Sequence, residues 1–144
     1  MIKVKTRSRM SEADLLGIRT KSPLGLTQRI ESGLPFDSIE RVSKKAGLPI
    51  DVLRSAVRIT PRTMARRRNE GRLSPDESDR LVSVSRLLAL AIGLFGGRVE
   101  SATRWLTAPN RALGRRSPIE AARTEIGTRE VENLIGRLEH GVFT

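Results

Sequence analysis

Residues 74–95 read SPDESDRLVSVSRLLALAIGLF, which is the longest apolar run in the chain. The spacing predicts one helix, and from Leu81 onward apolar side chains cover most of its circumference. A helix that is apolar nearly all round is buried on more than one side. The run is too short, and too polar at its start, to span a membrane. We therefore expect a central helix against which two further segments pack, with a subunit contact as an additional role.

The same local signals mark helix ends along the whole chain. A hydroxyl residue followed by proline is typical of an N-cap and first helical position, and Glu77 is placed to complete a capping box after Ser74. These pairs are Ser22-Pro23, Thr60-Pro61, Ser74-Pro75 and Ser117-Pro118. Glycine commonly follows the last helical turn. The glycines expected to end helices are Gly33, Gly47, Gly71 and Gly127, with Gly96-Gly97 ending the central helix.

Apolar spacing between these signals is helical, and alternating apolar–polar runs are almost absent, so the fold class is all-α. The expected helices span residues 12–17, 24–32, 36–46, 49–57, 61–70, 74–95, 99–106, 118–126 and 128–140. Residues 1–10 form a basic arm, for which disorder, a short strand and contact with DNA phosphates are all open.

Composition restricts the possible functions. The 144 residues include 27 Lys and Arg against 16 Asp and Glu, which gives a net charge of +11 and favours a polyanionic partner, chiefly nucleic acid. No cysteine and a single histidine leave no thiolate site and no multi-histidine metal site, so we expect no cofactor and no enzyme. No signal peptide is recognisable at the start, which favours the cytoplasm.

Residues 49–57 and 61–70 predict two short helices joined by three residues, which is helix-turn-helix spacing. The second helix, PRTMARRRNE, has Met64 as its expected core anchor and places its other side chains outward. Arginine can bind guanine through two hydrogen bonds, and the N-terminal residues of a recognition helix meet base edges. The candidate DNA-binding residues are Arg62, Thr63, Arg66, Arg67, Arg68 and Asn69. Arg68 and Arg72 suit phosphate contacts; the alternative is an arginine-rich helix in solvent.

The segment after Gly97 predicts a different module. Trp105 is expected in the core, with an interface role as the alternative. Residues 107–118, TAPNRALGRRSP, form a loop in which Asn110 bonds nearby backbone. Ile119, Ala122 and Ile126 would form the inner face of the next helix. The last helix would end near His140, which suits a C-terminal cap. Val142 and Phe143 are apolar, so residues 142–144 either fold back onto the core or enter a partner.

Several strings in this half resemble the toxin-binding domain of the Xre/MbcA/ParS antitoxin family. They are Trp105-Leu106, Pro109–Gly114, Ser117–Glu120, Arg123-Thr124, Gly127, Glu130-Val131 and Gly136–Phe143. Residues 50–81 resemble the Xre-type helix-turn-helix region of the same antitoxins. The match runs from about residue 34 to residue 143. One departure is visible, because Arg115 stands where the family often has a second glycine, and arginine is unfavourable if that position needs a positive φ.

The resemblance implies an antitoxin paired with a RES-domain toxin, a class that resembles ADP-ribosyltransferases and degrades NAD. It further implies a homodimer that binds double-stranded operator DNA and represses its own operon. The end of the chain would block the toxin's active site, which favours insertion over fold-back. The implied toxin-binding residues are Glu139, His140, Gly141, Val142, Phe143 and Thr144.

On this interpretation the chain divides into four parts. Residues 1–33 form an arm with short helices, and residues 34–73 form the DNA-binding region. Residues 74–97 form the connecting helix, and residues 98–144 form the toxin-binding domain. The alternative function is a stand-alone DNA-binding regulator without a toxin partner, since such a regulator would share the basic helix.

Overall fold

The computed structural model describes residues 10–19 and 22–141, and this part of the chain is all-helical apart from one isolated antiparallel bridge between Pro35 and Arg72. The expected fold class is confirmed. The α-helices are α1 (Glu12–Leu16), α2 (Pro23–Ser32), α3 (Asp37–Ala46), α4 (Ile50–Ala56), α5 (Pro61–Glu70), α6 (Pro75–Leu94), α7 (Val99–Thr107), α8 (Pro118–Ala121) and α9 (Glu125–Glu139), with a 3₁₀ turn, η1, at Arg111–Leu113.

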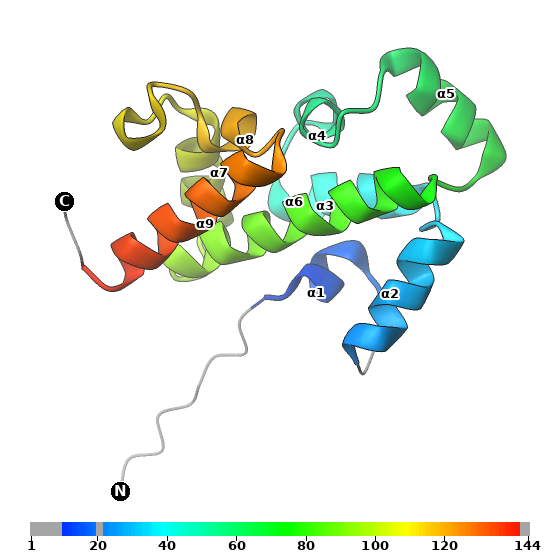
Figure 1. Cartoon of the computed structure of the whole chain (residues 1–144), viewed down its shortest axis with the longest axis horizontal. Helices are drawn as coiled ribbons and strands as arrows, with labels where there is room; N and C mark the ends of the chain where they lie inside the picture. Colours follow the sequence, from blue (N-terminus) through cyan, green and yellow to red (C-terminus); the bar gives the residue numbers. More distant parts are fainter. Residues whose placement is uncertain (1–9, 20–21, 142–144) are drawn as a thin grey trace, which may run out of the picture.

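Helix α6 is the centre of the fold, as its apolar circumference predicts. It packs against α1, α2 and α3 from the N-terminal half and against α7 and α9 from the C-terminal half. Figure 1 shows α4, α5 and α8 on one side of α6, with α1 and α2 on the opposite side. Its core side chains include Leu81, Leu87 and Leu88, none of which is more than 1% exposed. Both halves therefore share one hydrophobic core.

Backbone hydrogen bonds join the two ends of the helix-turn-helix half, the segment before α3 and the segment after α5. The Leu73 amide donates to the Leu34 carbonyl, and the Phe36 amide donates to the Gly71 carbonyl. The buried Ser78 hydroxyl of α6 accepts a hydrogen bond from the Leu34 amide at 2.8 Å. The chain entering α3 is thus joined both to the chain leaving α5 and to α6. These contacts fix the position of α5 relative to the central helix.

The expected caps are present. Ser74 accepts from the Glu77 amide while the Glu77 carboxylate accepts from the Ser74 amide, so the capping box is confirmed. Thr60 and Ser117 cap α5 and α8 through the side-chain oxygen alone, which accepts from the amide three residues on. The expected glycine ends are confirmed at Gly33, Gly47 and Gly71, which follow α2, α3 and α5 with positive φ.

The expected role of Gly127 is wrong. Helix α8 ends at Ala121, and Thr124 caps the following helix by accepting from the Gly127 amide at 2.9 Å. Gly127 therefore lies inside the first turn of α9, where a Cβ would come within 1.8 Å of the Ala121 carbonyl oxygen. Close approach of two helices, not chain reversal, requires this glycine. Because the boundary moves, Ile126 is 73% exposed instead of belonging to an inner face.

Trp105 is partly buried and packs against the core, with its ring centroid 6.3 Å from that of Phe95. This tilted pair covers the end of α6, where Phe95 forms the C-cap and Gly96 and Gly97 adopt positive φ. The expected packing of Trp105 against the core is confirmed for part of its surface. The turn after α6 then directs α7 back across the central helix.

Candidate nucleic-acid interface and toxin-binding segment

Helices α4 and α5 form the helix-turn-helix, and its connector is fixed by one left-handed residue and two local hydrogen bonds. Arg58 follows α4 with φ 61°, a left-handed conformation that reverses the chain. The Arg54 guanidinium donates to the Ile59 carbonyl at 2.7 Å, and Ile59 itself is buried. Thr60 then accepts from the Thr63 amide and so starts α5. The start of α5 is therefore fixed by contacts within the connector.

Met64 is buried and anchors α5, as expected, and leaves the opposite face of the helix to solvent. Arg62, Arg66 and Asn69 are exposed on α5. Arg66 has its Nε 3.8 Å from a Glu70 carboxylate oxygen, an exposed pair that contributes little. Among the described residues, no side-chain hydrogen bond or ion pair involves Arg62. These side chains are available to a ligand.

Arg67 is held differently from its neighbours. Its Nε donates to Glu77 Oε1 at 2.8 Å and its Nη2 to Oε2 at 3.3 Å, while Nη1 reaches Glu70 at 3.0 Å. The Glu77 side chain is only 7% exposed. Burial raises the pKa of this carboxyl, but hydrogen bonds from Arg67 and from the Ser74 amide outweigh that effect and hold it below its usual value. Arg67 therefore joins α5 to the start of α6.

Three further polar side chains of this region make contacts within the protein. The Arg68 guanidinium lies over the Phe36 ring, 5.3 Å from its centroid. Arg72 donates to the Ser32 and Gly33 carbonyls at the end of α2. The Thr63 hydroxyl lies 3.0 Å from the Thr60 hydroxyl. Of the six candidate DNA-binding residues, the structure thus leaves Arg62, Arg66 and Asn69 least engaged.

The loop before α8 is built on Asn110, as expected for a turn residue. Its Oδ1 accepts from the Ala112 amide at 2.9 Å, and its carbonyl accepts from the amides of Leu113 and Arg115. Arg115 has φ 69°, directly after Gly114 at φ 66°. The position where the family often has a second glycine thus does require a left-handed backbone. Arginine occupies it with strain.

The expected toxin-binding residues lie at the end of α9. Glu139 is the last residue of that helix, His140 forms its C-cap, and both side chains are exposed, as is Gly141. The expected capping position of His140 is confirmed. Val142, Phe143 and Thr144 lie outside the described residues.

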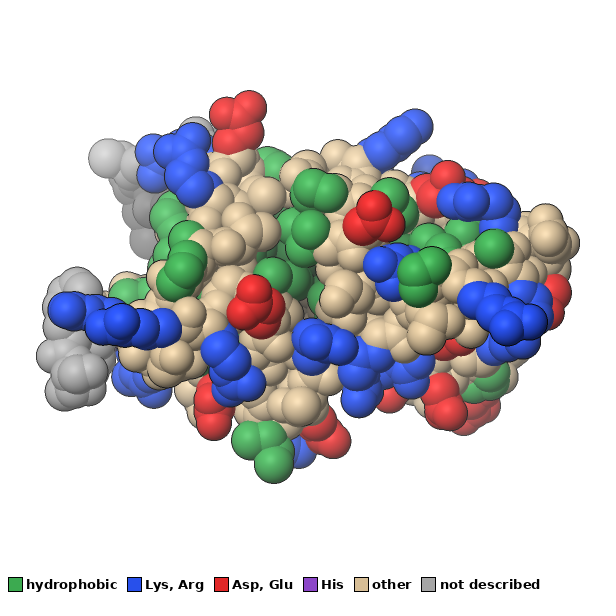
Figure 2. Space-filling view, turned by 90° about the horizontal axis from the view of Figure 1, so that it is seen from above, with side chains coloured by type: hydrophobic (Ala, Val, Ile, Leu, Met, Phe, Trp, Pro, Cys, Tyr) green, Lys and Arg blue, Asp and Glu red, His purple; other side chains and the backbone are tan. Residues whose placement is uncertain are grey.

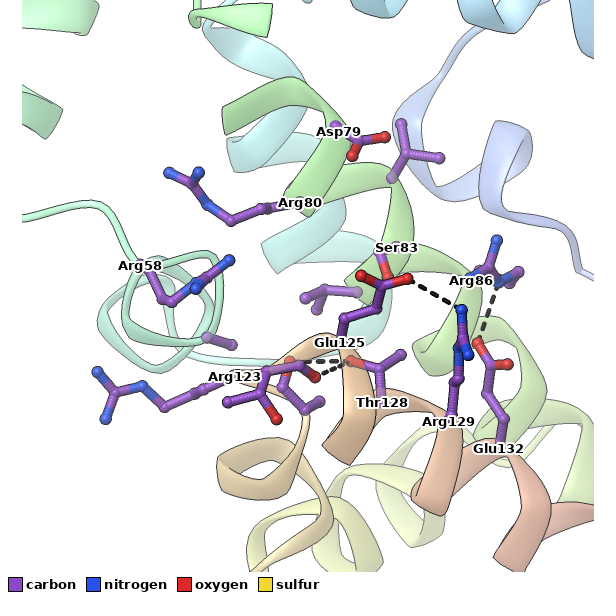
Figure 3. Close-up of a pocket in the computed structure, with 15 residues that line it drawn as sticks. Arg58, Asp79, Arg80, Ser83, Arg86, Arg123, Glu125, Thr128, Arg129 and Glu132 are labelled. Carbon is purple, nitrogen blue, oxygen red and sulfur yellow. Dashed lines mark hydrogen bonds and ion pairs between the residues drawn. The ribbon is translucent and has the colours of Figure 1, made fainter. Parts of the chain in front are cut away.

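A groove between the two halves was not predicted from the sequence. It has a volume of about 410 Å³ and is lined by five arginines together with acidic and small residues. Figure 3 shows Arg58, Arg80 and Arg123 in this groove, from the α4–α5 connector, α6 and the α8–α9 junction. No motif could have revealed it, because its arginines are far apart in the sequence and meet only when both halves pack on α6.

Comparisons with known proteins agree with this arrangement. Residues 25–86 match the antitoxin Xre-like helix-turn-helix domain, and residues 90–141 match the antitoxin Xre/MbcA/ParS C-terminal toxin-binding domain. Antitoxin Xre of Yersinia enterocolitica is 38% identical over 141 residues, which is 97% of this chain and 93% of the relative. The chain belongs to the Xre antitoxin family. The resemblance seen in the sequence is confirmed.

Other members of the Xre antitoxin family are also similar. Antitoxin Xre of Photorhabdus laumondii is 33% identical over 131 residues, covering 90% of this chain and 88% of the relative. Antitoxin Xre of Pseudomonas putida is 33% identical over 69 residues, covering 48% and 43%. The boundary between the two matched domains falls within α6, so the central helix contributes to both.

The described residues form neither a metal-binding cluster nor a single membrane-spanning helix. No three His, Cys, Asp or Glu side chains there are placed to hold a metal ion. In the same residues no single helix is long and apolar enough to cross a membrane; α6 and α7 reach that length and composition only together, with a 118° bend between them.

Proposed function

We propose that this chain is the antitoxin of a type II toxin–antitoxin pair, that it neutralises a RES-domain toxin that degrades NAD, and that it represses its own operon by binding operator DNA. Residues 34–73 are the DNA-binding region and residues 98–144 the toxin-binding domain. The chain acts in the cytoplasm, forms a homodimer and joins the toxin in a complex with several antitoxin copies. The observation that carries the proposal is the presence of both matched domains on one central helix.

The exposed face of α5 supports the DNA-binding part of the proposal. Arg62, Arg66 and Asn69 are the side chains that would reach base edges, since they are exposed and little engaged. Arg67 supports α5 from behind through Glu77, and Arg68 would add a phosphate contact beside Phe36. One helix-turn-helix reads only half a site, so two copies about 34 Å apart would read a pseudo-palindrome.

The toxin-binding part rests on the end of α9. Glu139, His140 and Gly141 are exposed there and lead directly to Val142, Phe143 and Thr144. An apolar Val-Phe pair loses contact with water when it enters a pocket, which contributes roughly 1.5–3 kcal/mol for each fully buried side chain. We propose that residues 142–144 enter the toxin's active site and exclude its substrate.

Co-expression tests this function. The protein encoded by the adjacent reading frame is expressed with the full chain, with a chain lacking residues 142–144, or alone, while growth and cellular NAD are measured. We expect NAD to fall with the adjacent protein alone and to recover with the full chain. The truncated chain should neutralise at least tenfold less well, since about 1.4 kcal/mol corresponds to tenfold in binding.

Two outcomes would contradict parts of this proposal. Full neutralisation by the truncated chain would exclude active-site blocking by residues 142–144. An adjacent protein that never lowers NAD would exclude the NAD-degrading toxin and leave the stand-alone DNA-binding regulator. DNA binding by the truncated chain serves as the control, because the truncation does not touch α5.

A further inference from the structure

The groove between the two halves joins elements that belong to different domains. The α4–α5 connector contributes Arg58, α6 contributes Arg80, and the junction after α8 contributes Arg123. Thr124, the N-cap of α9, also lines the groove. The helix-turn-helix and the toxin-binding half therefore share this one surface.

Charge is unevenly distributed along the groove. At one end, Arg129 donates to Glu125 at 3.1 Å and Arg86 to Glu132 at 3.1 Å, so these positive charges are neutralised locally. At the other end, Figure 3 shows Arg58, Arg80 and Arg123 on one side of the groove, where the side chains of Arg80 and Arg123 extend outward and that of Arg58 lies between them. That end has an excess of positive charge.

The three arginines keep hydrogen-bonding capacity for a ligand. Within the part of the chain that the structure describes, Arg80 donates only through its Nε, to the Val57 carbonyl at 2.7 Å, and its two terminal nitrogens make no hydrogen bond there. Arg58 and Arg123 are exposed, and among residues 10–19 and 22–141 no side-chain hydrogen bond or ion pair involves either of them. Like charges held close together repel one another, and an anion bound between them removes that repulsion.

The groove opens on the same side of the molecule as the start of α5. Figure 1 shows α4, α5 and α8 together above α6. Seen from that side, basic side chains occur along the whole length of the face, from the α5 end to the opposite end (Figure 2). A DNA duplex whose major groove holds the start of α5 would carry its sugar–phosphate backbone along this face.

We propose that Arg123, together with Arg58 and Arg80, binds a phosphate of the DNA backbone, so that the toxin-binding half contributes directly to DNA binding. The proposal rests on the function proposed above, because it adds a phosphate contact to the helix-turn-helix site. Guanidinium groups bind phosphate through paired hydrogen bonds, which suits arginines that line one groove and keep donors free. Phosphate contacts add affinity and fix orientation without reading sequence.

The test compares full-length Arg123→Gln with the unaltered chain. The probe is a labelled duplex of about 30 base pairs, three helical turns, from directly upstream of the chain's reading frame. Fluorescence anisotropy gives the affinity at several salt concentrations. Loss of one phosphate contact should reduce the slope of log K against log salt by about 0.9, which corresponds to roughly 5–10-fold weaker binding near 0.1 M salt.

A matched control separates a local contact from net charge. Arg29 is exposed on α2, which lies on the opposite side of α6, and Arg29→Gln removes the same single charge. We expect this variant to keep the slope and to bind within about twofold of the unaltered chain. Equal losses in both variants would overturn the proposal, since the effect would then come from net charge alone.

Arg66→Gln on α5 distinguishes this proposal from the function on which it rests. If Arg66→Gln weakens binding and Arg123→Gln changes neither affinity nor slope, the helix-turn-helix site stands and the groove contact is wrong. If inorganic phosphate binds the unaltered chain but not Arg123→Gln, while both bind DNA equally, the groove takes a free anion and the DNA contact is also overturned. If Arg66→Gln has no effect on DNA binding, the DNA-binding part of the proposed function fails.

Discussion

Replacing Glu77 by Gln should destabilise this protein much more than an ordinary surface change. Glu77 is a buried carboxylate that accepts two hydrogen bonds from Arg67 and one from the Ser74 amide. Gln keeps the size and can still accept from the Ser74 amide, but it removes the negative charge beside the partly buried Arg67. Breaking a buried pair costs about 3–5 kcal/mol. The Arg67 side chain is 19% exposed, which lets water reach it, so we expect about 2–3 kcal/mol.

Thermal and urea unfolding measure this loss. At about 2–4 °C per kcal/mol for a chain of this size, Tm should fall by roughly 4–12 °C. The matched control is Glu132→Gln, because Glu132 pairs with Arg86 at 3.1 Å in a more exposed position. That variant should lose only about 0–1 kcal/mol. Equal effects of the two changes would refute the reasoning that burial makes the Arg67–Glu77 pair special.

The pH dependence of stability provides a second measurement on the same pair. The pKa of Glu77 in the folded protein lies below its usual value of 4.5, so the unfolded chain binds more protons in this range. The stabilisation is therefore fully present above pH 4.5 and is lost as the pH falls through the folded-state pKa. Glu77→Gln should lose less stability than the unaltered chain below pH 4.5. A parallel decline of the two curves would contradict the assignment.

Two backbone positions give further predictions about stability. Gly127→Ala should lower the free energy of unfolding by at least about 1–3 kcal/mol, because the added Cβ would meet the Ala121 carbonyl oxygen. Gly136→Ala, in the same helix, is the control: its Cβ would lie in open space, so this change should stabilise the protein by about 0.5–1 kcal/mol. Urea unfolding checks both, and a stable Gly127→Ala variant would contradict the close helix approach. Arg115→Gly should stabilise by several tenths of a kcal/mol, because relief of about 1–2 kcal/mol at φ 69° exceeds the entropy lost by glycine. Arg116→Gly, the control, should destabilise, and a destabilised Arg115→Gly variant would argue against strain at this turn.

Much of the fold follows from signals that act within one helical turn. The Ser-Pro and Thr-Pro starts and most glycine ends were predicted correctly, because a cap depends on a side chain three residues from its partner amide. Residues 61–70 were placed without error, since Thr60, Pro61 and Gly71 mark both ends of α5. The burial of α6 was also predicted correctly, because a helix with apolar side chains on nearly all sides needs neighbours on more than one side.

Tertiary structure alone decided the features that join distant parts of the chain. The sequence alone cannot distinguish a glycine that ends a helix from a glycine that lets a neighbouring helix come close. The role predicted for Gly127 was therefore wrong, because only the position of the Ala121 carbonyl oxygen shows that a side chain would not fit there. The arginines of α5 look equivalent in sequence, yet Glu77 holds Arg67 and leaves Arg62 exposed. The groove at Arg58, Arg80 and Arg123 likewise exists only because α6 brings both halves together. Local propensity is set by neighbours along the chain, whereas burial and charge pairing depend on neighbours in space.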